Sequence, residues 1–217
     1  MQSNTLLWCA CGTALSVIAS AGSAAVINYG DFMGDNLLYT SVTETSLEPE
    51  VLYGAPSISG DSLEFVTPGF ASESGPGESD FRDGRLTTEV CDTNGGTIES
   101  LTVCFFGAFF VFDPGAFTTV SSFLFVDTPD GLYEGSFELT RSGTDTPGSG
   151  SWSGEFTVYF PATTCASVTL DTMLFSLGDD GTSFIDIKGL NIKPNVPAPS
   201  TASLLVAAGL VASRRRR

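Results

Sequence analysis

The chain contains no histidine, and this absence removes a large part of enzyme chemistry. Ser-His-Asp and Cys-His nucleophilic machinery need an imidazole that takes up a proton near neutral pH, and His-ligated zinc sites need it as a ligand. None of these sites can be built from this sequence. We expect a protein that has no catalytic residues and is not an enzyme.

Basic residues are scarce as well, because 9 Lys and Arg face 25 Asp and Glu and give a net charge of −16. Four of the nine are Arg214 to Arg217, so the rest of the chain carries 25 acids against five bases, a net charge of −20. Such a surface repels phosphate backbones, which excludes nucleic acid as a partner. The acidity either keeps an exported protein soluble or attracts divalent cations.

Aspartates gather in several turn-like segments, where their side chains commonly bond nearby backbone N–H groups. The same oxygens suit calcium, although no segment matches the EF-hand loop. We expect no cofactor and no metal, with Asp31 and Asp35 in YGDFMGDN as the calcium candidates of the alternative interpretation.

The sequence also lacks any sustained 3.6-residue apolar period between residues 26 and 195. Short runs instead alternate apolar with polar residues and are separated by turn clusters rich in Gly, Pro, Ser and Asp, which is typical of half-buried strands. Strands are predicted over residues 37–42, 62–67, 85–90, 97–106, 108–113, 117–127, 132–141, 151–160, 167–177 and 183–193. The pattern predicts one all-β domain over residues 26–195, a β-sandwich of jelly-roll or concanavalin-like topology.

Six phenylalanines are concentrated in CFFGAFFVFDPGAF, residues 104–117. Phenylalanine lacks the polar edge that Tyr and Trp bring to wet binding surfaces, so we expect this segment to be the buried middle of the sandwich. Trp152 is likewise expected to pack near the start of a strand.

Cysteines are few, and beyond residue 25 only Cys91, Cys104 and Cys165 remain, which allow one disulfide from three pairings. If residues 94–97 close a tight hairpin, Cys91 lies opposite Ser100 and Cys104 is about 13 Å away. That distance exceeds disulfide reach. A bond between Cys91 and Cys104 then needs another loop geometry, and a bond from either to Cys165 stays open.

Residues 1–25 have the pattern of a secretory signal peptide, with an apolar run from Leu6 to Ala21. Ser23 and Ala25 are the small residues that signal peptidase prefers before its cut, so cleavage is predicted before Val26. An uncleaved membrane anchor is the alternative. Both interpretations predict an exported chain.

The last segment, residues 196–217, reads VPAPSTASLLVAAGLVASRRRR. Its apolar part, Ala202 to Ser213, reaches about 18 Å as a helix against a hydrocarbon core of about 30 Å, so it predicts a short, marginal membrane helix. The terminal arginines favour the cytoplasmic side and leave residues 26–195 outside.

This tail has three parts in a fixed order: a proline motif, a small-residue apolar helix and an arginine cluster. It resembles the PEP-CTERM sorting signal of bacterial exosortase substrates, with Ala198 at the position of the central glutamate of the family. The resemblance implies that the tail is held in the inner membrane and cut near the proline motif by exosortase, an integral-membrane Cys protease or transpeptidase. The residues that carry it are Val196, Pro197, Ala198, Pro199, Arg214, Arg215, Arg216 and Arg217. A plain tail anchor with a proline linker is the alternative.

Together these features predict a protein that is anchored transiently in the inner membrane and then resides at the cell surface or in an extracellular matrix. Its expected role is structural or interactive, without catalysis. The alternative is a carbohydrate-binding module, with or without calcium, whose partner is an extracellular polysaccharide. A glycoside hydrolase comes third and would need two carboxylates about 5 to 10 Å apart.

Overall fold

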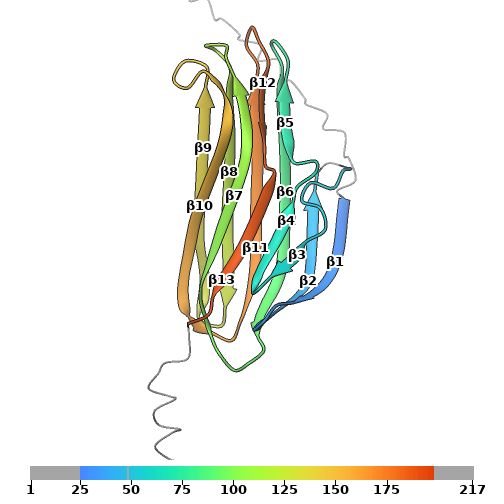
Figure 1. Ribbon diagram of the computed structural model, residues 1–217, viewed down its shortest axis with the longest axis vertical. Helices are drawn as coiled ribbons and strands as arrows, with labels where there is room; N and C mark the ends of the chain where they lie inside the picture. The colour runs from blue at the N-terminus through green and yellow to red at the C-terminus, as the bar shows by residue number, and fades with distance from the viewer. Residues whose placement is uncertain (1–24, 48, 198–217) are drawn as a thin grey trace, which may run out of the picture.

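The computed structural model describes residues 25–47 and 49–197. Within this part of the chain all regular secondary structure is β-strand (Figure 1). Ser23 of the predicted leader and residues 198–217 of the predicted sorting tail lie outside the described residues, whereas Ala25 begins the first strand. Among the described residues, no helix is both long enough and apolar enough to cross a bilayer.

Six antiparallel strands form one sheet, here called sheet A. Their order across the sheet is β1 (Ala25–Met33), β2 (Leu37–Ser46), β6 (Ser79–Asp92), β11 (Cys165–Leu177), β8 (Phe117–Thr128) and β9 (Gly131–Ser142). The long central strands β6, β11 and β8 pair without a register shift and form a regular platform.

Seven further strands form sheet B, which faces sheet A in a second layer (Figure 1). The order is β3 (Ser57–Ser59), β4 (Ser62–Val66), β13 (Gly189–Asn195), β7 (Ile98–Val111), β12 (Ser183–Asp186) and β5 (Ala71–Ser74), and β10 (Gly148–Thr163) pairs with the other edge of β7. Strand β7 is therefore central, with β10 on one side and β13 followed by β12 on the other.

The hydrophobic core fills the space between the two sheets. Successive side chains of a strand point to opposite faces, so alternate residues of β7 such as Leu101, Val103 and Phe105 are buried, and Leu170 and Leu174 of β11 belong to the same core. The two antiparallel sheets confirm the prediction of an all-β sandwich.

Three of the predicted runs are joined or divided in the structure. The runs 97–106 and 108–113 form one strand, β7, because the ladder with β10 continues through Gly107, whose register partner is Trp152. The run 183–193 is divided into β12 and β13, with Ile187 and Lys188 between them. Short strands β3 and β5, and the first strand β1, have no counterpart in the predicted set.

The hairpin considered for residues 94–97 does not form. Strand β6 belongs to sheet A and β7 to sheet B, so the connection crosses from one layer to the other. Within it the Asp92 carboxylate accepts hydrogen bonds from the backbone N–H groups of Asn94 at 2.8 Å and Gly96 at 2.6 Å. The crossing places Cys104 in the opposite sheet from Cys91.

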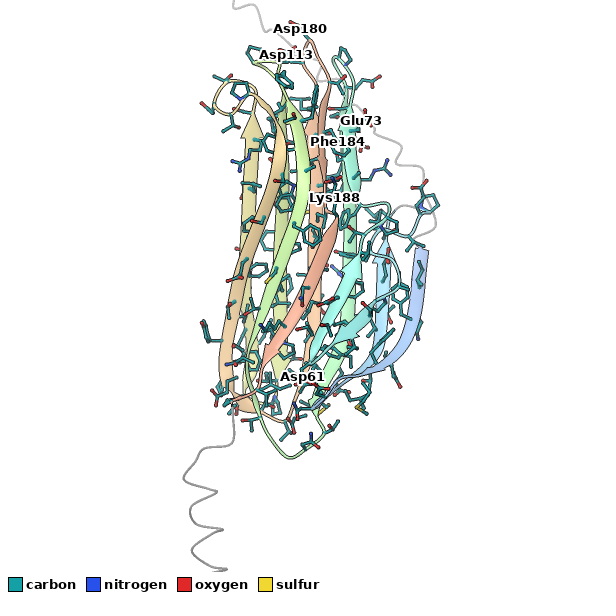
Figure 2. The ribbon with its side chains drawn as sticks, viewed as in Figure 1. Asp61, Glu73, Asp113, Asp180, Phe184 and Lys188 are labelled. Atoms are coloured by element: carbon teal, nitrogen blue, oxygen red, sulfur yellow. A yellow bond between two sulfur atoms is a disulfide. The ribbon has the colours of Figure 1, made fainter. Side chains whose placement is uncertain are left out.

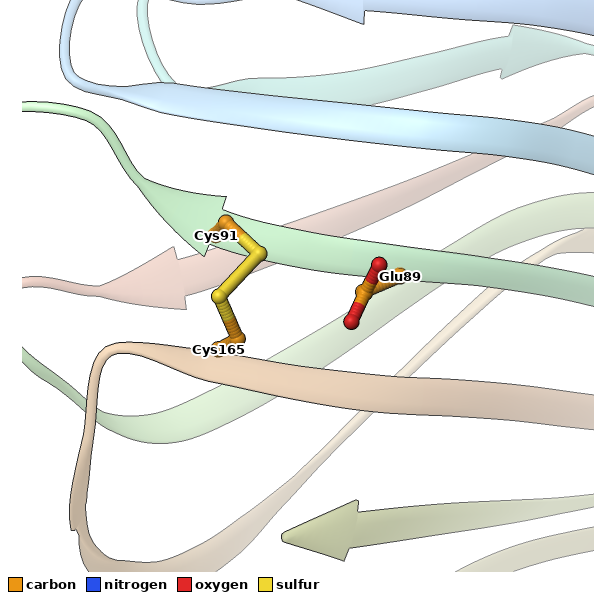
Figure 3. Close-up of side chains that lie close together, drawn as sticks. All are labelled: Glu89, Cys91 and Cys165. Carbon is orange, nitrogen blue, oxygen red and sulfur yellow. A yellow bond between two sulfur atoms is a disulfide. The ribbon is translucent and has the colours of Figure 1, made fainter.

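Of the three cysteine pairings, the structure contains Cys91–Cys165 (Figure 3). The two residues are direct register partners in β6 and β11, with Cα atoms 4.1 Å apart. Cys104 is a free thiol.

The prediction that the phenylalanine-rich segment is buried is correct for Phe105 and wrong for three of its neighbours. Phe106, Phe110 and Phe112 are 56%, 39% and 55% exposed. The reason is strand geometry, because adjacent residues of β7 point to opposite faces and half of a phenylalanine run must leave the core. Trp152 is buried as expected and donates from Nε1 to the carbonyl of Asp186 at 3.0 Å.

Candidate functional site on the outer face of sheet B

A row of polar side chains crosses the outer face of sheet B at the middle of β7. The register places Glu155 of β10 beside Cys104 of β7, Cys104 beside Asn191 of β13, and Asn191 beside Glu64 of β4. Cys104 Sγ donates to Glu155 Oε2 at 3.5 Å, and Asn191 Nδ2 donates to Glu64 Oε1 at 3.5 Å. The row thus presents hydrogen-bonding groups from four adjacent strands.

A second and a third row continue the same face towards the strand ends. Thr157 pairs with Thr102, whose other neighbour is Lys193, and the two threonine hydroxyls are 2.8 Å apart. Beyond them Tyr159, which is 75% exposed, stands beside Ser100. An exposed tyrosine combines an apolar ring with a polar hydroxyl, which suits it to a wet binding surface.

These rows line two adjoining depressions of about 650 Å³ and about 370 Å³. Lys193, Pro194 and Asn195 line both, so the end of β13 forms the ridge between them. We call the pair the β13 groove, and its remaining lining residues are Asn36, Ser59, Asp61, Ser62, Glu64, Asn191, Val196 and Pro197 on one side and Ser100, Thr102, Cys104, Glu155, Thr157 and Tyr159 on the other.

Asp61 holds the far wall of the groove in place, at the lower end of the molecule in Figure 2. Its carboxylate accepts hydrogen bonds from the Asn36 backbone at 2.6 Å, from Asn36 Nδ2 at 2.7 Å and from the Leu37 backbone at 3.2 Å. These bonds fasten the β1–β2 turn to the β3–β4 turn. Asp61 is therefore a positioning residue of the groove.

The free thiol in the groove is held in its protonated form. Burial raises the pKa of Cys104, the hydrogen bond to Glu155 and the charge of that carboxylate raise it further, and Lys193 opposes them. Because the thiolate is the nucleophilic form, this environment does not activate Cys104.

The calcium candidates of the sequence analysis are not part of this groove. Asp31 accepts a hydrogen bond from the Ser41 backbone at 2.8 Å, within the irregular β1–β2 ladder. In the described part of the chain, neither Asp31 nor Asp35 belongs to a group of three or more acidic or cysteine side chains that could share an ion.

Two such groups exist among the described residues. In one, Glu89 stands beside Cys91 and Cys165, whose sulfur atoms are bonded to each other and are not free thiolates (Figure 3). In the other, carboxylate oxygens of Asp113, Asp179 and Asp180 lie within 4.8 Å of one another. Figure 2 shows Asp113 and Asp180 at the upper end of the sandwich, opposite the end that carries Asp61.

Of the groove residues, the sequence singled out Val196 and Pro197 as part of the sorting motif and Cys104 as a possible disulfide partner, and none of them as part of a binding site. Val196 and Pro197, expected in the sorting motif, line the groove, and Val196 also packs against the core. Glu64, Tyr159 and Lys193 were not identified, because strand pairing between distant segments brings them together. The one available signal was at Tyr159. Its neighbours Val158 and Phe160 are the apolar residues expected to face the core, so Tyr159 between them is expected on the outer face.

No family model matches the chain, and no curated protein matches it. Among solved structures, similarity is found to TmCBM61 in complex with β-1,4-galactotriose, with 15% identity, a TM-score of 0.30 and coverage of 81% of this chain and 90% of that chain. The mannan-recognising module TmCBM27 has 14% identity and a TM-score of 0.28, and the match covers 77% of this chain and 88% of that chain. The xylan-binding module CBM15 has 12% identity and a TM-score of 0.25, and the match covers 81% of this chain and 99% of that chain. These TM-scores are too low to support an inference about ligands.

Proposed function

We propose that the protein is a non-catalytic binding module that holds an uncharged polysaccharide in the β13 groove. The observation that carries this proposal is the groove itself, in which two open depressions share Lys193 and are lined by hydroxyl, amide and carboxylate groups beside the exposed ring of Tyr159. Hydroxyl-rich sugar rings have polar edges and apolar faces, and this lining offers a counterpart to both.

The charge of the molecule supports an uncharged ligand. The net charge is −16, and Asp61, Glu64 and Glu155 outnumber Lys193 in the groove. An anionic polymer would approach against this field. A neutral polysaccharide meets no such barrier and can use the carboxylates as hydrogen-bond acceptors.

The arrangement of the carboxylates supports binding without hydrolysis. Two strands lie between Glu155 and Glu64, and each glutamate is engaged by the residue beside it, Cys104 and Asn191 respectively. A glycosidase instead needs an acid and a second carboxylate that flank one scissile bond.

The proposed location rests on the sequence of the two terminal segments. We propose export through the leader ending at Ala25 and sorting through the tail from Val196 to Arg217, with signal peptidase and exosortase as processing enzymes. The mature domain would then meet polysaccharide at the cell surface or in the matrix around the cell.

Binding is tested with a glycan array that carries neutral and anionic polysaccharides, followed by calorimetry on the neutral glycan with the strongest signal. We expect competable binding to a neutral glycan, unchanged when EDTA replaces calcium. Tyr159→Ala and Lys193→Ala should each weaken it about tenfold, the effect of losing one well-placed contact.

The control is Leu132→Ala, which truncates an exposed side chain at the sheet A edge strand β9, and it should bind as the wild type does. Absence of binding to every glycan would overturn the proposal and leave a purely structural role. Release of reducing ends from the bound glycan would contradict the non-catalytic assignment.

A further inference from the structure

Exposed aromatic side chains continue from the β13 groove along the outer face of sheet B. On β7, Ser100, Thr102 and Cys104 line the groove, and the next residues of the same parity include Phe106 and Phe110. Alternate residues of a strand share one face, so the groove and these phenylalanines lie on the same surface.

Phe106 forms an apolar platform in the middle of this face. Its register partner in β13 is Gly189, and a methyl group added to Gly189 would overlap the Phe106 ring, so the ring lies over the glycine. The other neighbour of Gly189 is Val66 of β4, which is also exposed. The Phe106 ring thus lies over the glycine, with the exposed Val66 on the other side of it, and the Phe106 side chain is still 56% exposed.

A second aromatic platform lies further along β7. The Phe110 and Phe112 rings are 4.9 Å apart and nearly perpendicular, and Phe184 of β12 is the register partner of Phe110. Figure 2 shows Phe184 in the upper half of the molecule, with Lys188 below it and Asp61 at the lower end. We call Phe106, Phe110, Phe112 and Phe184 the aromatic line.

The distances along β7 are those of an extended ligand. Phe106 lies six positions after Ser100, which is beside Tyr159, and this corresponds to about 20 Å. Phe110 lies four positions after Phe106, which corresponds to about 13 Å. The groove and the aromatic line therefore span about 33 Å along one strand.

The charge of the protein argues for an uncharged ligand on the aromatic line. Glu73 is the register partner of Phe184, and Asp186 lies two residues further along β12. A second copy of this chain, with its net charge of −16, would bring these acids against its own, and anionic lipid headgroups would be repelled as well. The surface beside these rings carries both signs of charge, because Arg82 lines the same depression as Glu73 and Phe184 and the exposed Lys188 follows β12. An exposed aromatic surface that is continuous with a polar groove, on a chain with a large net negative charge, fits an uncharged polymer with apolar ring faces.

We propose that the β13 groove and the aromatic line form one continuous binding face for a long, linear, uncharged polysaccharide that runs parallel to β7. This inference rests on the proposed function and adds a chain-length requirement to it. Short oligosaccharides fill the groove alone, whereas longer chains of the same glycan also stack on Phe106 and on the Phe110 cluster.

The test is calorimetry with a ladder of oligosaccharides, from disaccharide to polymer, of the neutral glycan found on the array. For the wild type, affinity per chain should rise by about a hundredfold once the chain is long enough to reach Phe110. Phe110→Ser and Phe106→Ser should each weaken the affinity for long chains about tenfold and leave the affinity for short oligosaccharides unchanged. The matched control is Phe123→Ser on sheet A, because Phe123 and Phe110 are both 39% exposed.

The outcomes separate this inference from the proposed function. If short and long chains bind equally well, or if Phe110→Ser binds long chains as the wild type does, the aromatic line is not a binding surface and the groove assignment stands. If the wild type binds no oligosaccharide of any length, both fail. If light scattering shows a dimer that Phe110→Ser dissociates, the face is an interface between copies and the inference is overturned.

Discussion

At the scale of single residues, the most informative side chain is a carboxylate in the core. Glu44 of β2 is 1% exposed and accepts hydrogen bonds from the backbone of Leu52 at 2.6 Å, the backbone of Tyr53 at 3.3 Å and the Tyr29 hydroxyl at 2.5 Å. Burial, the hydrogen bond to Glu44 and the charge of Glu44 raise the pKa of Tyr29, in that order. Glu44 thereby fastens the segment after β2 to sheet A.

Replacing Glu44 by glutamine should be strongly destabilising. A glutamine side chain keeps one acceptor oxygen but turns its NH2 group towards donors, so at least one buried N–H loses its partner. Hydrogen bonds to charged groups contribute about 1.5–3 kcal/mol, and we expect Glu44→Gln to lower the free energy of unfolding by about 2–4 kcal/mol in urea denaturation.

Glu89→Gln is the matched control, because Glu89 is exposed on the outer face of sheet A. Its free energy of unfolding should stay within about 0.5 kcal/mol of the wild-type value. Equal stability of the Glu44 and Glu89 variants would show that the buried carboxylate does not hold this segment.

At the scale of elements, the pairing of β6 with β11 decides the covalent structure. The antiparallel register makes Cys91 and Cys165 direct partners, although 74 residues separate them in the sequence. Closing a loop of this size restricts the unfolded chain, and removing such a bond typically costs about 2–4 kcal/mol.

Cys91→Ser combined with Cys165→Ser should therefore lower the free energy of unfolding by about 2–4 kcal/mol. Cys104→Ser is the control and should leave both the stability and the disulfide unchanged, because Cys104 is a free thiol in the other sheet. Stability curves measured with and without reductant check this. A wild-type curve that reductant does not shift would contradict the expected contribution.

Element boundaries show where sequence patterns lose information. Phe137 and Leu139, and likewise Val158 and Phe160, are apolar residues two positions apart with a polar residue between them. This alternation correctly predicts β9 and β10. Strands β3 and β5 contain only three and four residues, too few for an alternation to be recognised, and they exist because β4 and β12 offer them a free edge.

At the scale of the whole molecule, the two chain ends carry the predictions about export and sorting. The folded domain reaches Pro197, so the rest of the predicted sorting motif follows directly after the groove. We expect mass spectrometry of the mature protein from its native host to find an N-terminus at Val26 and a C-terminus near Pro199. Replacing Arg214 to Arg217 by serine should abolish the C-terminal cut, because we expect these arginines to keep the tail from crossing the membrane.

A mature protein that retains Arg217 in the final cell fraction would contradict processing of the tail. Tyr159 lies in β10 and outside the predicted sorting tail, so the Tyr159→Ala variant serves as the control and should be cut as the wild type is. Sorting and binding can thus be tested independently.

The sequence by itself determined the class of the fold and the chemistry that is absent. Alternating short runs predict strands, and a chain without histidine cannot build imidazole-dependent sites. Its jelly-roll or concanavalin-like topology, its export and its sorting stay predictions. Only the tertiary structure decided which side of each strand meets the core, because a period of two is the same whichever phase is buried.

Because the other face of β7 is the buried one, Phe106 and Phe110 lie on the surface beside the β13 groove instead of in the core. It also brought Glu155, Asn191 and Glu64 into one row from strands far apart in the sequence. Pairing between distant strands is fixed by the collective burial of both sheets, and no local pattern encodes it.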